Sequence, residues 1–110
     1  MRIYVAGAIS NGIVSDNVNV ATAAATKLLE AGHAPFLPHL SVLWQMIAGP
    51  IPYETWITYD FEWIDVCEAL VRIPGFSPGG DREVIYAKSK GIPVYFGLDE
   101  FFLAHPPQKV

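Results

Sequence analysis

Two acidic residues, Asp60 and Glu83, stand where a folded chain could use them for chemistry. Apolar residues recur with helical spacing over residues 53–66, and Pro52 suits the first position of a helix. On a projection at about 100° per residue, Asp60 falls in the middle of the apolar face of this helix. The other members of that face are Trp56, Ile57, Phe61, Trp63, Ile64 and Cys67. Because burying an unpaired carboxylate costs on the order of several kcal/mol, we interpret Asp60 as a functional residue.

Glu83 follows the glycine-rich turn of residues 74–80. A structural explanation exists for it, because an acid in the first turn of a helix is stabilised by the helix dipole, and Gly80 and Glu83 have the spacing of a capping box. If Glu83 and Asp60 face one pocket, however, one carboxylate can act as a nucleophile while the other donates a proton. Carboxylate pairs of this kind cleave glycosidic bonds through an oxocarbenium-like transition state.

A loop bounded by glycines, residues 7–12, is a second candidate for substrate binding. The Lys-Ser/Thr pair of a P-loop is replaced by Ile13 and Val14, and no GxGxxG motif is present. The backbone amides of the loop and the helix that follows could still bind one phosphate or a sugar hydroxyl. Alternatively, the glycines only shape a tight turn between a strand and a helix.

Three other side chains could face the same pocket, and each has a structural alternative. Tyr4 lies inside the first strand, so its hydroxyl could reach the pocket or satisfy a core partner. His39 follows the second strand and could bind substrate, or it could be a turn residue bonded to a backbone carbonyl. Trp56 could stack on a base or belong to the core.

The elements that must position these residues alternate between strands and helices. Strands are predicted over residues 2–6, 34–37, 69–73 and 92–96, and helices over residues 41–48, 53–66, 81–90 and 98–104. Another helix is predicted to begin at one of the cap candidates Ser15, Asp16 and Asn17 and to end at Gly32, with an inner stripe of Val18, Ala21, Ala25, Leu28 and Leu29. Pro35 and Pro38 place the second strand near an edge of the sheet.

This alternation predicts a parallel sheet covered on both faces, with right-handed crossovers and its functional rim at the carboxyl ends of the strands. We therefore expect an α/β fold of the Rossmann or flavodoxin-like type, a three-layer sandwich with a four- to five-stranded parallel sheet. Residues 1–104 are expected to form a single domain, and residues 105–110 a C-terminal tail.

Composition and charge limit the classes of ligand. The formal net charge is −4, and seven of the eleven acids fall between Glu54 and Glu83, which argues against a nucleic-acid partner. The histidines His33, His39 and His105 lack metal-ligand spacing, so we expect no metal and no cofactor. A small molecule remains the expected partner.

The single cysteine, Cys67, allows no internal disulfide and fits a reducing cytoplasm. The apolar run after Met1 is too short for a signal peptide or a membrane span, so no membrane association is expected. These features predict a cytoplasmic protein.

Four segments, which together cover most of the chain, carry a family resemblance. They are IYVAGAIS (residues 3–10), FLPHLSVLW (residues 36–44), YETWITYDFEWIDVCEAL (residues 53–70) and GFSPGGDREVIYAKSKGIPVY (residues 75–95). The most specific feature is their order: a tyrosine, an aspartate in a D-x-E-W helix, Ser-x5-Glu, and then Gly-Ile-Pro-Val. In these features the sequence resembles the nucleoside 2-deoxyribosyltransferase-like superfamily, and most closely its short, phage- and bacterium-associated members of uncharacterised function.

The resemblance implies a role for each candidate catalytic residue. Glu83 would attack the anomeric carbon of a nucleoside or nucleotide, and Asp60 would handle the proton at the base or orient the sugar. Tyr4 would lie beside the nucleophile. The molecule that then accepts the sugar determines the activity. Water as the acceptor makes the enzyme an N-glycosidase, and a second base makes it a transferase.

Position 77 bears on the substrate that the resemblance implies. Ser77 is similar to the serine that binds the 5′-phosphate in the monophosphate N-glycosidases of the superfamily, whereas the nucleoside transferases tend to have an acid there. Those hydrolases carry a basic residue where this chain has Ser10, so Arg82 and the helix N-termini would have to bind the phosphate. The candidate substrate-binding residues are Gly7, Ala8, Ile9, Ser10, His39, Trp56, Ser77, Gly79 and Arg82.

The sequence therefore predicts an N-glycosidase that hydrolyses the base–sugar bond of a (deoxy)nucleoside 5′-monophosphate. Two alternatives are a nucleoside 2-deoxyribosyltransferase that exchanges bases and a nucleotide-binding or sensing module without turnover. Because small members of the superfamily usually complete their pockets across a subunit interface, a homodimer or a higher homo-oligomer is also expected.

Overall fold

Four parallel strands form the centre of the molecule in the computed structural model, which describes residues 1–107. The strands are β1 (Arg2–Ala6), β2 (Ala34–Phe36), β3 (Ala69–Arg72) and β4 (Val94–Phe96). Their order in the sheet is β2-β1-β3-β4, and every neighbouring pair is parallel. This arrangement confirms the expected parallel sheet, with β2 at one edge.

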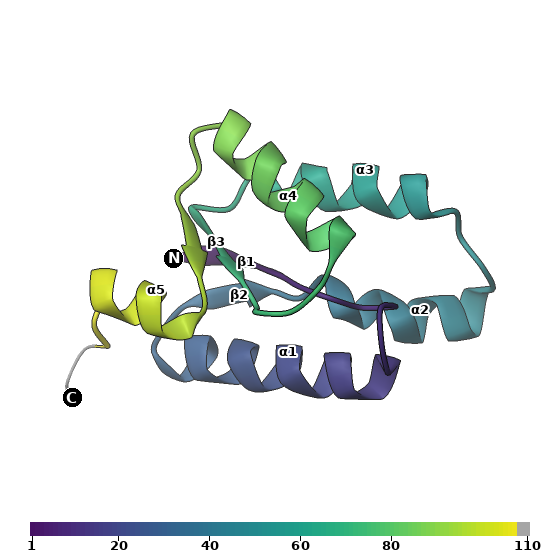
Figure 1. Cartoon of the computed structure of the whole chain (residues 1–110), viewed down its shortest axis with the longest axis horizontal. Helices are drawn as coiled ribbons and strands as arrows, with labels where there is room; N and C mark the ends of the chain where they lie inside the picture. Colours follow the sequence, from purple (N-terminus) through teal and green to yellow (C-terminus); the bar gives the residue numbers. More distant parts are fainter. Residues whose placement is uncertain (108–110) are drawn as a thin grey trace.

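Helices cover both faces of the sheet (Figure 1). They are α1 (Val14–Glu30), α2 (Ser41–Ala48), α3 (Tyr53–Ile64), α4 (Pro78–Ser89) and α5 (Leu98–Ala104), with a short 3-10 turn, η1 (Pro38–Leu40), before α2. One face packs against α1 and α5, and the other packs against α3 and α4. Within residues 1–107, none of the helices has the length and apolar character needed to cross a bilayer.

Alternating side chains of β1 and β3 supply the two cores. Ile3 and Val5 point toward α1 and α5 and pack with Val71 of β3. Tyr4 packs on the opposite face, with Leu70 of β3. Because both faces of these strands are buried, the sequence shows a continuous apolar run here rather than an alternating one.

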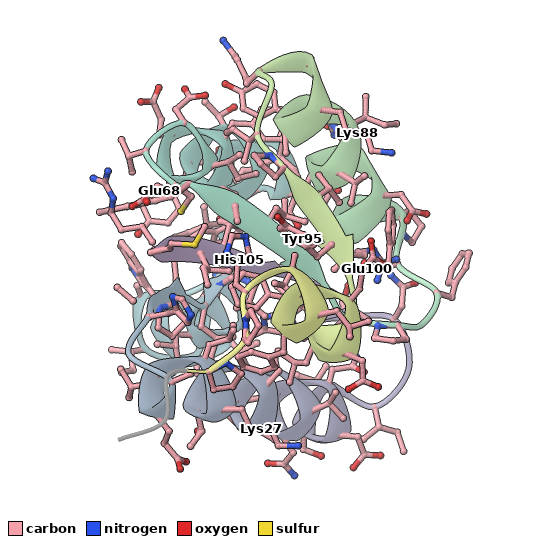
Figure 2. The ribbon with its side chains drawn as sticks, turned by 90° about the vertical axis from the view of Figure 1, so that its left-hand side faces the viewer. Lys27, Glu68, Lys88, Tyr95, Glu100 and His105 are labelled. Atoms are coloured by element: carbon pink, nitrogen blue, oxygen red, sulfur yellow. The ribbon has the colours of Figure 1, made fainter. Side chains whose placement is uncertain are left out.

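A polar contact between Tyr95 of β4 and His105, both labelled in Figure 2, links the residue after α5 to the sheet. The hydroxyl of Tyr95 lies 3.0 Å from Nε2 of His105. His105 is the first residue of the expected tail, whose residues 108–110 lie outside the described part of the chain.

Three element starts differ from the predictions, among them that of β4, which begins at Val94 rather than at residue 92. The helix α4 begins at Pro78 rather than Asp81, because Ser77 is the N-cap and its Oγ accepts the Gly80 N–H at 2.9 Å. The helix α1 begins at Val14, ahead of the expected caps. The side-chain amide of Asn17 instead donates to the carbonyls of Ile9 (2.9 Å) and Asn11 (2.7 Å) and so closes the first loop.

Two residues expected on inner helix faces are exposed, Trp63 by 41% and Leu29 by 62%. Trp63 lies at the border of its helix face and stacks on Phe36 of the edge strand, with ring centroids 5.0 Å apart. The buried face of α1 is rotated slightly from the predicted face, so that Ala24 is buried in place of Leu29.

Leu28 and Leu29 are adjacent and chemically identical, and they test this packing. We expect Leu28→Ala to lower the free energy of unfolding by about 2 to 5 kcal/mol, because Leu28 is fully buried. Leu29→Ala should change it by less than about 0.5 kcal/mol. Urea unfolding monitored by circular dichroism measures both, and equal losses would contradict the assigned face of α1.

Candidate active site

The three residues expected to be catalytic come from three different elements and meet on the α3–α4 side of the sheet. Tyr4 projects from the middle of β1, where it pairs with Phe36 of β2 and Leu70 of β3 in the two neighbouring registers. Asp60 comes from the inner face of α3, and Glu83 comes from the second turn of α4. All three side chains are buried, as the helical period predicts for Asp60.

The position of Glu83 excludes the simpler explanations for this acid. It lies five residues after the first residue of α4, Pro78, so it is beyond the first turn of the helix. The capping box expected between Gly80 and Glu83 does not form, because Ser77 is the cap. Glu83 instead accepts a hydrogen bond from the hydroxyl of Tyr4.

The Tyr4 hydroxyl acts as a hydrogen-bond donor to Glu83. Burial raises the pKa of Tyr4 well above its ordinary value, and the nearby charges of Glu83 and Asp60 raise it further. The phenol therefore keeps its proton and directs it to Glu83 Oε2.

The two carboxyl groups share one environment. Burial raises the pKa of Asp60 to about 6, although hydrogen bonds to Glu83 and Tyr4 oppose the rise. Burial also raises the pKa of Glu83, to about 8; the Tyr4 hydrogen bond and the charge of Arg72 oppose this, while Asp60 reinforces it. Since the groups interact, they titrate as a pair that holds one proton near neutral pH. The site can thus present one carboxylate and one carboxylic acid at the same time.

A cavity of about 80 Å³ adjoins this pair at the carboxyl ends of β1 and β3. Its lining residues, besides Asp60 and Glu83, are Gly7, Ile9, Ser10, Asn11, Tyr53, Ile57, Ser77, Gly79 and Gly80. This is the rim at which parallel sheets bind ligands, next to the point where the connections leave β1 and β3 in opposite directions. No basic side chain among residues 1–107 lines the cavity. Within the same residues, no cluster of three or more His, Cys, Asp or Glu side chains could hold a metal ion.

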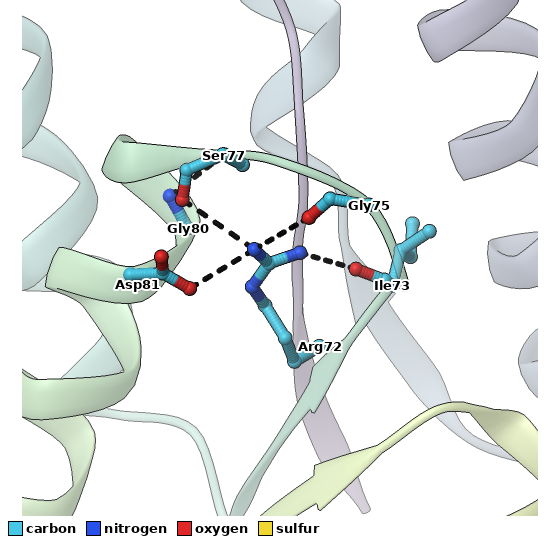
Figure 3. Close-up of polar contacts among 6 residues, drawn as sticks. All are labelled: Arg72, Ile73, Gly75, Ser77, Gly80 and Asp81. Carbon is cyan, nitrogen blue, oxygen red and sulfur yellow. Dashed lines mark hydrogen bonds and ion pairs between the residues drawn. The ribbon is translucent and has the colours of Figure 1, made fainter.

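Arg72 is a residue of the site that the sequence reasoning missed (Figure 3). Its buried guanidinium donates to the carbonyl oxygens of Ile73, Gly75 and Ser77, and it forms an ion pair of 3.0 Å with Asp81. These contacts fold the segment after β3 around one cation and fix the start of α4. An arginine inside the otherwise apolar run of residues 69–73 was the available signal.

The remaining substrate-binding candidates lie at different distances from the pair. Gly7, Ile9, Ser10, Ser77 and Gly79 line the cavity. Gly7 also has a packing role, because a Cβ there would lie 3.0 Å from Cβ of Ile73.

Ala8 and His39 meet behind the first loop rather than in the cavity of the acid pair. Nε2 of His39 lies 3.1 Å from the Ala8 carbonyl. Burial lowers the pKa of His39 to about 4, although the bond to Ala8 opposes this, so the ring is neutral and Nε2 is the donor. The two residues line a separate small cavity together with Asn17.

Trp56 and Arg82 also lie outside the cavity of the acid pair. Trp56 packs edge-on against Trp44, with ring centroids 5.2 Å apart, and lines a neighbouring pocket of about 270 Å³ between α2 and α3. Arg82 lies on the surface, where its guanidinium donates two hydrogen bonds to Glu54, of 2.9 and 3.0 Å. Its guanidinium carbon lies 5.9 Å from the ring centroid of Tyr53, which does line the cavity.

Comparison with known proteins gives a family and a fold. Residues 1–96 match the family described as "Domain of unknown function (DUF4406)". A search of curated proteins found no match. Among solved structures, a 2-deoxyribosyltransferase from the psychrotolerant bacterium Bacillus psychrosaccharolyticus is similar, with a TM-score of 0.69 and 23% sequence identity. The alignment covers 86% of this chain and 69% of that chain. This likeness confirms the expected nucleoside 2-deoxyribosyltransferase-like fold.

Gly79 and Gly80 test the contribution of Arg72. A Cβ at Gly80 would lie 2.9 Å from Nε of the buried Arg72 and 3.0 Å from Oγ of Ser77. Because four contacts hold that guanidinium in place, we expect Gly80→Ala to lower the free energy of unfolding by about 1 to 3 kcal/mol. Gly79→Ala is the matched control, since its Cβ would meet only the hydroxyl of the exposed Tyr53, at 3.2 Å. Thermal unfolding compares the two variants, and a Gly80→Ala protein as stable as Gly79→Ala would show that the arginine is not fixed there.

The raised pKa of Glu83 makes the free energy of unfolding depend on pH. Because folding raises this pKa from 4.5 to about 8, the folded state binds the proton more tightly, and stability falls as the pH rises through that interval. Glu83→Gln cannot ionise, so we expect it to be more stable than the wild type by on the order of 3 kcal/mol at about pH 9. The difference should shrink to about 1 kcal/mol or less at about pH 5.

Urea unfolding at the two pH values measures this difference. Glu62→Gln, which removes an exposed acid from α3, is the control and should behave like the wild type. A Glu83→Gln protein that is less stable than the wild type at the higher pH would contradict the buried, proton-binding environment.

Proposed function

The chain belongs to the DUF4406 family, and we propose that it hydrolyses the N-glycosidic bond of a (deoxy)nucleoside 5′-monophosphate. The observation that carries the proposal is the buried pair of Asp60 and Glu83, held with the Tyr4 hydroxyl beside a cavity at the rim of the sheet. A fold has no use for two adjacent buried acids, whereas glycosidic chemistry requires a nucleophile and a proton donor together.

In the first step, the carboxylate of Glu83 attacks C1′ of the sugar and forms an ester bond. The bond between C1′ and the base nitrogen breaks, and its electron pair leaves with the base. The shared proton, which the higher pKa of Glu83 places on that residue before substrate binds, moves to Asp60 as Glu83 attacks, and Asp60 delivers it to the departing base. Tyr4 orients the attacking carboxylate through its hydrogen bond to Oε2 and so acts as a positioning residue.

In the second step, a water molecule attacks C1′ and the ester bond to Glu83 breaks. The Asp60 carboxylate accepts the proton of the attacking water, so the sugar leaves with a hydroxyl group at C1′. The shared proton and the Glu83 carboxylate are thereby regenerated, as microscopic reversibility requires.

Polar groups around the cavity suit the rest of the substrate. The Ser77 hydroxyl accepts the Gly80 N–H, so its own hydrogen is available for a phosphate oxygen, and the N-terminus of α4 favours the negative charge. Ser10 and the first loop face the same space. Because the cavity of about 80 Å³ is smaller than the roughly 300 Å³ of a typical small-ligand site, the exposed Tyr53 must turn aside to admit substrate.

The outlying candidates would then act around the nucleotide. With Tyr53 displaced, Arg82 is the cation that could reach the phosphate, by exchanging Glu54 for it. Trp56 would contact the base at the border of the neighbouring pocket. His39 would hold the first loop in place through Ala8.

Base exchange between nucleosides is the second candidate, and the likeness of fold to a 2-deoxyribosyltransferase favours it. The chemistry at Glu83 and Asp60 would be unchanged, and a free base would replace water in the second step. The lack of a basic side chain on the cavity wall within residues 1–107 also agrees with an unphosphorylated substrate.

Incubation with a panel of nucleosides and nucleoside 5′-monophosphates, with and without a second free base, tests both candidates. We expect free base from at least one monophosphate without added base, and a loss of more than about a thousandfold in kcat for Glu83→Gln, because the nucleophile is removed. Asp60→Asn should lose about 10² to 10⁴-fold. Chromatography of the released base is the measurement, with Glu62→Gln as the active control.

The panel also separates the alternatives. Turnover that appears only when a second base is supplied would replace the hydrolase with the transferase. Thermal stabilisation by a nucleotide without base release, unchanged in Glu83→Gln, would indicate a binding module. No release from any nucleoside or nucleotide would refute the enzymatic proposal.

A further inference from the structure

Two further cavities lie next to α1, on the side of the sheet opposite the acid pair. The larger, of about 400 Å³, lies between α1 and α5 and has the volume of a small-molecule site. The smaller, of about 80 Å³, lies behind the first loop. Val20, Ile73 and Pro74 line both, so the two cavities adjoin. Among residues 1–107, neither shares a lining residue with the cavity of Asp60 and Glu83.

The larger cavity has a mostly apolar wall. Side chains of α1, β3 and α5 form it, among them Ala24 and Leu98. Its charged residues, Lys27 and Asp99, are exposed and opposite in sign, so the wall selects neither an anion nor a cation. Phe96 is 54% exposed, which leaves an aromatic ring available to a ligand. This wall therefore suits a neutral, aromatic molecule.

The smaller cavity is lined by a residue with a buried hydrogen-bond acceptor. This residue, His39, is 1% exposed, and its Nε2 donates to the Ala8 carbonyl at 3.1 Å. Since burial lowers the pKa of His39 to about 4, the ring is neutral and Nδ1 keeps a lone pair. This buried Nδ1 atom has no hydrogen-bond partner within residues 1–107. Because folded proteins pair nearly all buried polar atoms, Nδ1 indicates a ligand that donates a hydrogen bond.

Asn17 presents a second acceptor on the same wall. Its side-chain amide donates to the carbonyls of Ile9 and Asn11, which leaves its Oδ1 oxygen as an acceptor. The remaining wall residues of the smaller cavity have apolar side chains. In the described part of the chain, the side-chain atoms left for a ligand in this cavity are thus both acceptors. Their complement is an O–H or N–H group, and the oxygens of an anion would be repelled.

We propose that the two cavities form one binding site for a small, neutral aromatic molecule that carries an O–H or N–H group. The aromatic body lies in the larger cavity, against its apolar wall and the ring of Phe96. The O–H or N–H group enters the smaller cavity and donates to Nδ1 of His39. The ligand thereby combines the two properties that the adjoining walls select.

The first loop connects this site to the acid pair. Ala8, which His39 holds, stands between Gly7 and Ile9, and both of these line the cavity of the pair. Ile73, on the shared wall, lies so close to Gly7 that a Cβ there would be 3.0 Å from its own Cβ. A molecule bound to His39 therefore bears on the loop at the acid pair, as an effector does. The proposal itself does not depend on any turnover.

Matched pairs of probes test the proposal. Indole and N-methylindole have nearly the same shape, but only indole has an N–H; phenol and anisole form the corresponding O–H pair. We expect indole and phenol to bind the wild type at least about tenfold more tightly than their methylated partners, because only they can donate to His39. Titration followed by NMR measures the affinities. The nitrogen-15 signal of Nδ1 should move with indole and not with N-methylindole.

Two substitutions locate the bound probe. His39→Gln keeps an amide donor for Ala8 but has no acceptor at the Nδ1 position, so the preference for indole over N-methylindole should disappear. Ala23→Phe, at an exposed position on the wall of the larger cavity, should weaken binding of both probes by at least about tenfold, because the added ring occupies the space of the ligand. Thr26→Phe, exposed on the same helix but outside that wall, is the matched control. Circular dichroism checks that each variant is folded.

Several outcomes would overturn the proposal. Equal affinities within each pair of probes, or a preference for indole that survives His39→Gln, would remove the role of Nδ1. Indole binding that is unchanged in Ala23→Phe would place the ligand elsewhere, and no binding of indole or phenol would leave no site for this class of molecule. An Nδ1 signal that already shows a hydrogen bond and does not respond to indole would assign the smaller cavity to ordered water.

Discussion

The burial of two acids at one place is the constraint on which the rest of the site depends. Asp60 and Glu83 are both removed from water, and the Tyr4 hydroxyl on the strand below donates a hydrogen bond to Glu83. Burial raises the pKa of both acids, and Asp60 raises that of Glu83 further, so the pair holds on to a proton near neutral pH that exposed acids would release. Burying both acids lowers the stability of the fold. Functional sites tolerate such a cost more readily than cores do, so the pair indicates a functional site.

The surrounding structure supplies what the pair needs to stay in place. The β1 strand contributes Tyr4, while Arg72 at the end of β3 gathers three carbonyl oxygens and Asp81 and so fixes the start of α4. Glu83 lies further along the same helix, where burial raises its pKa to about 8 and the charge of Arg72 opposes that rise. The elements of the fold thus set both the position and the charge of the nucleophile that we propose.

Much of this could be predicted from the sequence, because periodicity reports burial. The helical period placed Asp60 inside, the alternation of strands and helices predicted the parallel sheet, and Pro35 and Pro38 predicted the edge position of β2. The period did not resolve residues at the borders of a face, such as Trp63 and Leu29, where a rotation of one residue decides exposure. Arg72 was missed because three of its partners are backbone carbonyls, which leave no pattern in the sequence, and its place inside an apolar run was the one signal that pointed to it. The exposure of Leu43, Met46 and Ile47 on α2 could not be predicted either, since periodicity gives an apolar stripe but not the side that it faces.

The central claim is that Asp60 and Glu83 behave as one acid–base unit. Titration of the side-chain carboxyl carbons by carbon-13 NMR, in the wild type and in Asp60→Asn, tests it most directly. The account predicts that Glu83 titrates well above its ordinary value of 4.5 and that its pKa falls when the negative charge at position 60 is removed. A Glu83 carboxyl that titrates near 4.5 in both proteins would contradict the account.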